Sequence, residues 1–176
     1  MLGLMFMLLA GAGFVSPGAS HCDPREVRVD VLPFEVREDF SVPYAHLDGI
    51  AAEVGFVRET MTVHVEGCRA IVGYANPVLY VASELKSNPC AFDTVLEHER
   101  HHADIYRSAL QDLERRIRTA ALEKPLFEAA VQEVTAVQSA HDAFDSRDEY
   151  RKNVTACGGH IYRLALHRDD STLRPF

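Results

Sequence analysis

The stretch CAFDTVLEHERHHADIY, residues Cys90 to Tyr106, is the part of this sequence that most constrains the fold. At its centre His98, Glu99 and His102 form the pattern HExxH. If the stretch is helical, the two histidines lie one turn apart on the same face, because an α-helix has about 3.6 residues per turn. Both imidazoles can then reach one cation, and zinc suits them because catalytic zinc sites combine three protein ligands with a water. We therefore predict Zn2+ held by His98 and His102.

Glu99 would face the open side of this ion. A carboxylate there can take a proton from a zinc-bound water and hand it to the leaving group, which makes Glu99 the predicted general base. The alternative is a solvated helix face without metal, because a chain with nine histidines can contain HExxH by chance. Asp93 or Thr94 can cap the expected helix. Its apolar residues recur at helical spacing: Val95, Leu96, Ile105, Leu110, Leu113 and Ile117.

The composition is that of one folded domain. The chain has 176 residues, of which 47% are hydrophobic, enough for one core. Its formal net charge is -8, and it contains no basic run interleaved with aromatic residues. Such a chain has little with which to neutralise phosphates, so its composition argues against a nucleic-acid partner.

The first twenty residues, MLGLMFMLLAGAGFVSPGAS, are mostly apolar and contain no charged residue. We predict that residues 1–20 are a secretory signal cleaved near Ser20, which leaves one domain over residues 21–176. The mature protein would be periplasmic or secreted and would have no transmembrane span. A lipoprotein attached through Cys22 is the alternative. We disfavour it because His21 stands where a small residue normally precedes the modified cysteine.

The cysteines predict disulfides if the protein is exported. Cys22, Cys68, Cys90 and Cys157 can form two bridges in three connectivities. We prefer Cys68 with Cys90, which would join the strand region to the start of the HExxH helix. Cys22 with Cys157 would then tie the two ends of the domain together.

Alternation of polar and apolar residues predicts β-strands ahead of the HExxH helix. The expected strands are residues 26–32, which 34–37 can continue, and a meander of 59–66, 68–74 and 78–83 with a turn at Asn76 and Pro77. A short helix is expected from Ser41 to Val54. In a metallopeptidase, an edge strand beside the zinc holds the substrate by strand addition. Residues 78–83 are our candidate, although their apolar run equally permits an interior strand.

A second helix is predicted from Leu126 to about His141, close behind a first helix that we extend to about Leu122. So short a connection makes the two helices antiparallel. Both rise about 1.5 Å per residue, so a hairpin centred near residue 122 brings His98 level with position 146 and His102 level with position 142. Glu133 would be level with position 111, too far from the histidines to bind the same ion.

Two residues near the predicted level of the metal can complete the site. His141 would give a three-histidine set, and Asp145 a set of two histidines and a carboxylate. Asp145 or Ser146 could instead cap a last helix that reaches Cys157. The third ligand is left open between Asp145 and His141, with His160 or a water as further alternatives.

Two segments carry a resemblance to a known group: VLYVASELKSNPCAFDTVLEHERHH, residues 78–102, and FDSRDEY, residues 144–150. Over roughly residues 68–157 the chain resembles the DUF922-like group of bacterial exported proteins, which are described as secreted zinc-dependent proteases. The resemblance implies zinc at His98 and His102 and a catalytic role for Glu99.

The same resemblance bears on the segment after the second helix. In that group a Tyr-Asp pair is followed by a Thr-x-His element. Here Phe144 and Asp145 match the pair, and Tyr150 stands where the histidine is expected. Tyr150 could instead donate a hydrogen bond to the oxyanion formed during peptide hydrolysis.

The fold class that we predict is α+β. A small zincin-like domain would pack a short antiparallel meander on the HExxH helix and its antiparallel partner helix. The leading hypothesis for function is an exported zinc metallopeptidase that hydrolyses a peptide or protein substrate with water activated by Glu99. The alternatives are a non-enzymatic periplasmic or cell-surface binding module with a structural or vestigial metal site, and a zinc amidase acting on cell-wall peptides.

Overall fold

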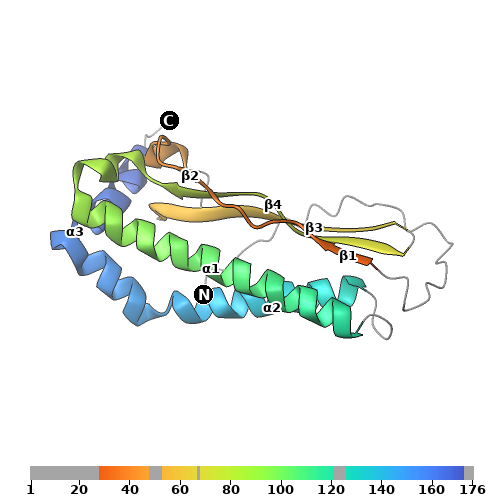
Figure 1. Ribbon diagram of the computed structural model, residues 1–176. Helices are drawn as coiled ribbons and strands as arrows, with labels where there is room; N and C mark the ends of the chain where they lie inside the picture. The colour runs from red at the N-terminus through yellow and green to blue at the C-terminus, as the bar shows by residue number, and fades with distance from the viewer. Residues whose placement is uncertain (1–27, 48–52, 67, 121–125, 173–176) are drawn as a thin grey trace.

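A computed structural model describes residues 28–47, 53–66, 68–120 and 126–172. The elements are, in chain order, β1 (Arg28–Val31), β2 (Arg37–Asp39), the 3-10 helix η1 (Tyr44–His46), β3 (Gly55–Glu66), β4 (Arg69–Val81), the 3-10 helix η2 (Ser83–Ser87), α1 (Pro89–Ala120), α2 (Leu126–Phe144) and α3 (Arg147–Thr172). Figure 1 shows the sheet lying along α1, with α2 and the first part of α3 on the other side of that helix. The last part of α3 packs near η1, where Ala165 accepts a hydrogen bond from Tyr44 (3.4 Å). The mixture of helix and strand agrees with the predicted α+β class. The proposed signal and Cys22 lie outside the described residues.

Strand β4 is the centre of the sheet. β3 pairs with it in antiparallel orientation along nearly its whole length, from Gly55 opposite Val81 to Glu66 opposite Arg69. β1 and β2 both run parallel to β4, β1 beside its first half and β2 beside its second. A strand has only two edges, so β1 and β2 both pair with the edge of β4 that β3 does not occupy. The described sheet therefore has β3 along one side and β1 with β2 along the other.

The expected antiparallel meander is wrong in two respects. The sheet is not antiparallel throughout, because β1 and β2 run parallel to β4. The two predicted strands on either side of Asn76 and Pro77 are one strand, and the predicted turn is a bulge within it. Arg58 pairs with Val78 but Thr60 pairs with Ala75, so β4 carries one extra residue there. Asn76 absorbs the irregularity with φ of 50°, a conformation that asparagine adopts more readily than most residues.

Residues 78–83 are consequently not an edge strand. Val78 to Val81 belong to β4 and pair with β3, and Val78 to Tyr80 also pair with β2 on the other side. Their apolar run reflects burial inside the sheet: Leu79 and Val81 are among the most buried residues of the core. The strand with an open edge is β3, since β4 is its one partner among the described strands.

Helix α1 begins earlier than expected and packs one face on the sheet. Asn88, rather than Asp93 or Thr94, caps it: the Asn88 side-chain oxygen accepts a hydrogen bond from the backbone N–H of Ala91 (3.2 Å). Pro89 occupies the first helical position, where its missing N–H is not needed. The buried residues recur at helical spacing and form what we call the buried stripe: Ala91, Val95, Leu96, Glu99, Ala103, Leu110 and Leu113. This stripe contacts β4, for example through Leu113 against Val72.

Helix α2 and the first part of α3 lie along the opposite side of α1. α2 runs antiparallel to α1, as predicted, and extends to Phe144. α3 is two helical pieces joined by a kink at residues 156–159, where Cys157, Gly158 and Gly159 have φ between 53° and 73°. A disulfide joins Cys157 in this kink to Cys90 in the first turn of α1.

This bridge contradicts the predicted pairing of Cys68 with Cys90 and of Cys22 with Cys157. Cys68 is also disulfide-bonded, to a partner outside the described residues. The reason lies in the helix packing: α3 folds back along α1, which brings residues 67 positions apart to a Cα separation of 5.7 Å. That separation is typical of a disulfide.

The helix expected from Ser41 to Val54 is also wrong over the described residues. Only Tyr44–His46 are helical, as η1, and residues 48–52 lie outside the described part of the chain. Tertiary contacts, rather than local helix propensity, determine the conformation of this segment. The backbone N–H of Tyr44 donates to the Glu84 carboxylate (3.0 and 3.1 Å), and both Tyr44 and Leu47 are buried in the core.

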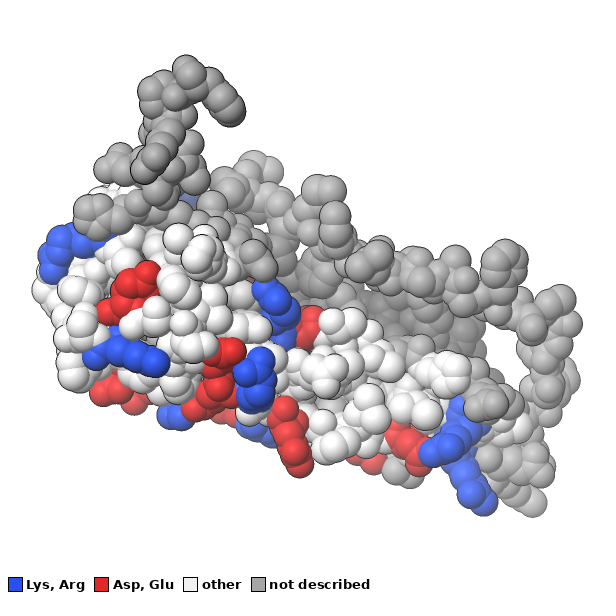
Figure 2. All heavy atoms as spheres, turned by 90° about the horizontal axis from the view of Figure 1, so that it is seen from above, with Lys and Arg blue, Asp and Glu red and all other residues white. Residues whose placement is uncertain are grey.

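The face of the sheet away from α1 carries charges of both signs. Arg37 pairs with Asp39 (3.1 Å), and Arg69 pairs with Asp30. Seen from above the sheet, Figure 2 shows basic and acidic side chains interspersed among uncharged ones. Within the part of the chain that is described, no helix has the length and apolar character needed to cross a membrane.

Candidate metal centre

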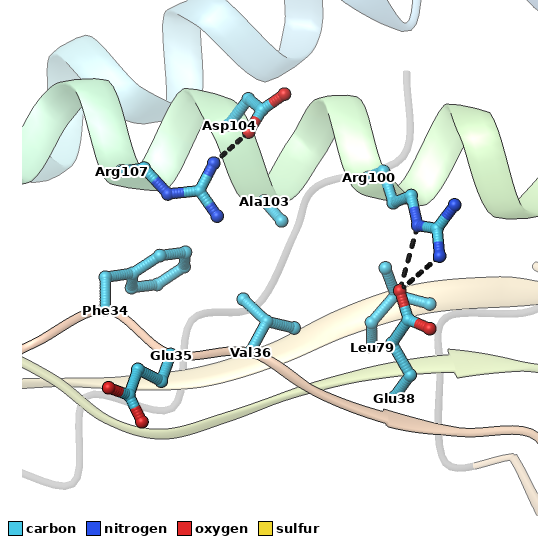
Figure 3. A pocket seen from close by; sticks show the side chains of 9 residues that line it. All are labelled: Phe34, Glu35, Val36, Glu38, Leu79, Arg100, Ala103, Asp104 and Arg107. Atoms are coloured by element: carbon cyan, nitrogen blue, oxygen red, sulfur yellow. Dashed lines mark hydrogen bonds and ion pairs between the residues drawn. The ribbon is translucent and has the colours of Figure 1, made fainter.

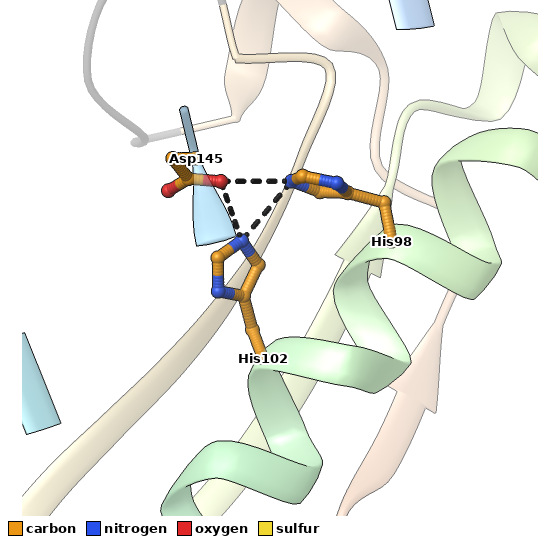
Figure 4. A group of neighbouring side chains, drawn as sticks. All are labelled: His98, His102 and Asp145. Carbon is orange, nitrogen blue, oxygen red and sulfur yellow. Dashed lines mark hydrogen bonds and ion pairs between the residues drawn. The ribbon is translucent and has the colours of Figure 1, made fainter. Parts of the chain in front are cut away.

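Two turns of α1 supply the first two residues of the site. His98 and His102 stand one turn apart beside the buried stripe, on the side of α1 that contacts α2 and α3. Both side chains are largely covered, with 19% and 12% of their surface exposed. Their Nε2 atoms lie 3.1 Å apart, both directed toward the same point (Figure 4). The helical spacing of HExxH therefore produces the predicted juxtaposition.

Asp145 comes from the junction between α2 and α3. The neighbouring Ser146 is the residue that caps α3: its hydroxyl accepts a hydrogen bond from the backbone N–H of Glu149 (3.3 Å). Asp145 is thus not used as the cap, and its carboxylate turns toward α1. Its Oδ1 lies 3.2 Å from Nε2 of His98 and 3.2 Å from Nε2 of His102.

These three atoms form a nearly equilateral triangle with sides of 3.1, 3.2 and 3.2 Å. A zinc ion with ligand bonds of about 2.0–2.1 Å in tetrahedral geometry requires its ligand atoms to be about 3.3 Å apart. The observed sides are close to that value. Two imidazole nitrogens and a carboxylate oxygen are also a usual ligand set for catalytic zinc. His98, His102 and Asp145 therefore fit a metal ion, and zinc is among the ions that their chemistry suits.

The carboxylate of Asp145 is held in its charged form. Burial acts to raise its pKa, but the hydrogen bonds and charges of His102 and His98 outweigh burial, so the pKa of Asp145 lies well below its ordinary value. An ionised carboxylate grouped with two imidazole nitrogens is a donor set that suits a divalent cation.

The second nitrogen of each histidine also has a partner. Nδ1 of His98 lies 3.1 Å from the side-chain amide of Asn153, on α3. Nδ1 of His102 lies 2.6 Å from Nδ1 of His141, on α2. Such contacts fix the orientation of imidazoles that bind metals. His141 is thus beside the group rather than within it, because it meets the nitrogen of His102 that faces away from Asp145.

Phe144 fills the space between the histidines. Its ring stacks on His101 (centroids 4.0 Å apart) and on His98 (4.7 Å), and it meets His102 edge-on at 5.1 Å. Phe144 directly precedes Asp145, so this packing holds the end of α2 at the height where Asp145 reaches the histidines.

Glu99 directly follows His98 on α1 and is only 5% exposed. Burial raises the pKa of its carboxyl well above the ordinary value, and the negative charges of Glu53 and Asp145 act in the same direction. The first residue of β3, Gly55, lies against it: a Cβ built on Gly55 would be 2.9 Å from Oε1 of Glu99 and 2.7 Å from Val95. Only a residue without a side chain fits there, so the open-edged strand passes directly over the carboxyl of Glu99.

Other predicted residues lie outside the group. Glu133 is buried and pairs with Arg116 (3.3 Å), far along the helices from the histidines, as the register predicted. His160 lies in α3 beyond the kink and is not one of the three clustered residues. The side chain of Tyr150 is not among those described, so its suggested role stays a prediction.

Asn153 and Gly55 were not predicted from the sequence. In a helix capped at Ser146, Asn153 lies two turns after the cap. Helical spacing counted from Ser146 could therefore have indicated that Asn153 lies near the site. No local signal marks Gly55, because its contact with Glu99 depends on how β3 packs against α1.

A separate hollow of about 370 Å3 lies between α1 and the segment leading into β2 (Figure 3). Its residues on α1 lie across the buried stripe from the two histidines, so it is not the metal centre. The two arginines that line it are both paired, Arg100 with Glu38 (2.8 Å) and Arg107 with Asp104. Both arginines of the hollow are thus neutralised by a neighbouring carboxylate.

The carboxylate can be tested by removing its charge. We expect Asp145→Asn to weaken zinc binding by more than about 10²-fold, because the loss of a residue that only orients a ligand already weakens binding by about 10–100-fold. Asp142→Asn is the matched control, because Asp142 is exposed and accepts a hydrogen bond from Gln138 instead. Zinc affinities measured by competition with a chromogenic chelator compare the two variants. Equal affinities in both would exclude Asp145 as a ligand.

Comparison with known proteins does not place the chain in a family. The sequence matches no family model, and no curated protein and no solved structure is significantly similar to it.

Proposed function

We propose that this protein is an exported zinc metallopeptidase, with His98, His102 and Asp145 as the zinc ligands and Glu99 as general base. The observation that carries the proposal is the triangle of two imidazole nitrogens and a carboxylate oxygen beside a buried glutamate. Residues 68–157 also resemble DUF922-like secreted zinc-dependent proteases, and we keep this resemblance as part of the proposal.

The roles follow from the surroundings of each group. Bound zinc would supply Lewis acidity, which lowers the pKa of a water and polarises a carbonyl. Glu99 would accept a proton from a water and deliver it to the leaving amine. Its raised pKa suits this double role, because a carboxyl of ordinary pKa holds a proton poorly at neutral pH. His98 and His102 are kept in place through Asn153 and His141.

The substrate would bind as an extended peptide along β3. An extended chain can add to an open strand edge through backbone hydrogen bonds, whatever its side chains. β3 has such an edge among the described strands, and its first residue lies on Glu99. A peptide added there would lie along the strand whose first residue contacts the base. β3 thus takes the role that we first expected of residues 78–83.

Export is supported by two features. The uncharged apolar residues 1–20 are typical of a secretory signal. The Cys90–Cys157 disulfide is of a kind that persists in oxidising compartments.

A side chain at Gly55 should disturb the base without disturbing the zinc ligands. We expect Gly55→Ala to lower kcat/KM by about 10²-fold, because its Cβ would displace the Glu99 carboxyl and small displacements of catalytic groups have effects of that size. Zinc affinity should stay within about twofold. Gly73→Ala is the matched control: its Cβ would approach Leu32 to 2.5 Å, which strains the same sheet far from Glu99. If both variants lose activity equally, general strain and not Glu99 is responsible.

The proposal is tested by zinc content and peptide hydrolysis together. Protein purified without chelator should contain one zinc per chain and cleave members of a mixed peptide library. Chelator should abolish cleavage, and added zinc should restore it. One tightly held zinc without cleavage of peptides or of cell-wall fragments would favour a binding module. Cleavage confined to cell-wall peptides would favour an amidase, and no stoichiometric zinc would overturn the proposal.

A further inference from the structure

His141 is half-buried in a position that packing alone does not explain. Its ring lies between two side chains of α1 that are one turn apart, with centroids 4.7 Å from the His102 ring and 4.6 Å from the Tyr106 ring. Tyr106 in turn packs on Tyr74 of β4 (5.1 Å). The imidazole of α2 is therefore held between successive turns of α1, and its orientation is set by its neighbours.

One nitrogen of this ring has a partner and the other does not. Nδ1 of His141 lies 2.6 Å from Nδ1 of His102. Nε2 of His141 is buried and has no hydrogen-bond partner among the described residues. An unpaired buried polar atom destabilises the fold, and an apolar ring of the same size would avoid that penalty. The imidazole is thus better explained by its contact with His102 than by packing.

The proton between the two rings can be assigned from what surrounds His102. Its Nε2 lies 3.1 Å from Nε2 of His98 and 3.2 Å from Oδ1 of Asp145, so this nitrogen offers its lone pair to a cation. A neutral imidazole that binds metal through Nε2 carries its proton on Nδ1. That proton points at Nδ1 of His141, which accepts it.

We infer that His141 is a positioning residue of the metal centre, which accepts the Nδ1–H of His102 and so selects the tautomer and ring orientation that direct Nε2 toward Asp145. The inference rests on the proposed metal site but not on the proposed reaction. The inference gives α2 itself a role in the site, because its residue His141 orients the ligand His102. Four residues later, the junction between α2 and α3 supplies a further ligand, Asp145.

Two substitutions separate hydrogen bonding from packing. His141→Phe keeps an aromatic ring between His102 and Tyr106 but has no acceptor. His141→Asn is smaller, yet its side-chain oxygen can take the place of Nδ1 and accept the same proton. His64→Phe is the control, because His64 is exposed on β3 and lies outside the metal group.

We expect zinc affinity, measured by chelator competition, to fall about 10–100-fold in His141→Phe, the usual effect of losing a partner of a metal-binding histidine. His141→Asn should stay within about threefold of the unaltered protein, and so should His64→Phe. Equal affinity in His141→Phe and the unaltered protein would overturn the inference. Equal losses in His141→Phe and His141→Asn would overturn it too, because packing would then be the cause.

A second measurement does not depend on the variants folding. X-ray absorption of the zinc-loaded, unaltered protein should count two imidazoles on the metal. Three would make His141 a ligand and overturn the inference. A protein that binds no zinc overturns both this inference and the proposed function. If the protein binds zinc, and His141→Phe weakens that binding, but no peptide is hydrolysed, then only the proposed reaction is overturned.

Discussion

Glu99→Gln is expected to lower kcat/KM for peptide hydrolysis by about 10²–10⁴-fold, the usual contribution of a general base, while leaving zinc bound. The amide has nearly the same shape as the carboxyl but cannot accept and return a proton. Glu99 is not part of the triangle formed by His98, His102 and Asp145, so its loss should not change the ligand set. Activity and zinc content measured on the same preparation test both halves of the expectation.

The control is Glu97→Gln, which removes the same charge from an exposed position of α1 only two residues away. It should retain activity. Hydrolysis that survives Glu99→Gln would show that another group activates the water. Loss of zinc in that variant would instead make Glu99 a ligand, and the proposed division of roles would be wrong.

Removal of the Cys90–Cys157 disulfide is expected to lower the free energy of unfolding by about 4 kcal/mol. The two cysteines are 67 positions apart, and closing a loop of that length restricts the unfolded chain to about this extent. Urea unfolding of Cys90→Ser, Cys157→Ser and the double variant measures the effect. All three should lose the same amount, because each removes the same single bond.

The bridge also bears on the metal centre. α3 is joined to α1 at Cys157, one turn beyond Asn153, which contacts His98. A looser α3 should therefore weaken zinc binding several-fold, less than Asp145→Asn does. A stability loss below about 1 kcal/mol would mean that helix packing alone holds α3 in place.

Predictions that depended on one helix, or on two helices joined by a short connection, succeeded. The spacing of His98 and His102 places their nitrogens 3.1 Å apart, because helix geometry is the same wherever the helix lies. The register of the hairpin brought Asp145 level with His98 and His141 level with His102, because both helices rise equally per residue. Glu133 was excluded by the same arithmetic and pairs with Arg116 instead.

Predictions that depended on which distant segments meet were less successful. The turn chemistry at Asn76 and Pro77 suits a reversal of the chain, but here β3 pairs with residues on both sides of it and keeps β4 continuous. Four cysteines allow three connectivities, and their spacing gave no means of choosing the bridge between Cys90 and Cys157.

The sequence by itself determined the pairing of His98 with His102, the antiparallel helices and the two candidates for the third position of the group. Each depends on repeats of about 1.5 Å and 3.6 residues that the backbone imposes locally. Only the tertiary structure decided that Asp145 faces the histidines, that His141 meets the far nitrogen of His102, and that Gly55 lies over Glu99. Those choices depend on how helices and strands distant in sequence pack together, and burial, not local spacing, selects among them.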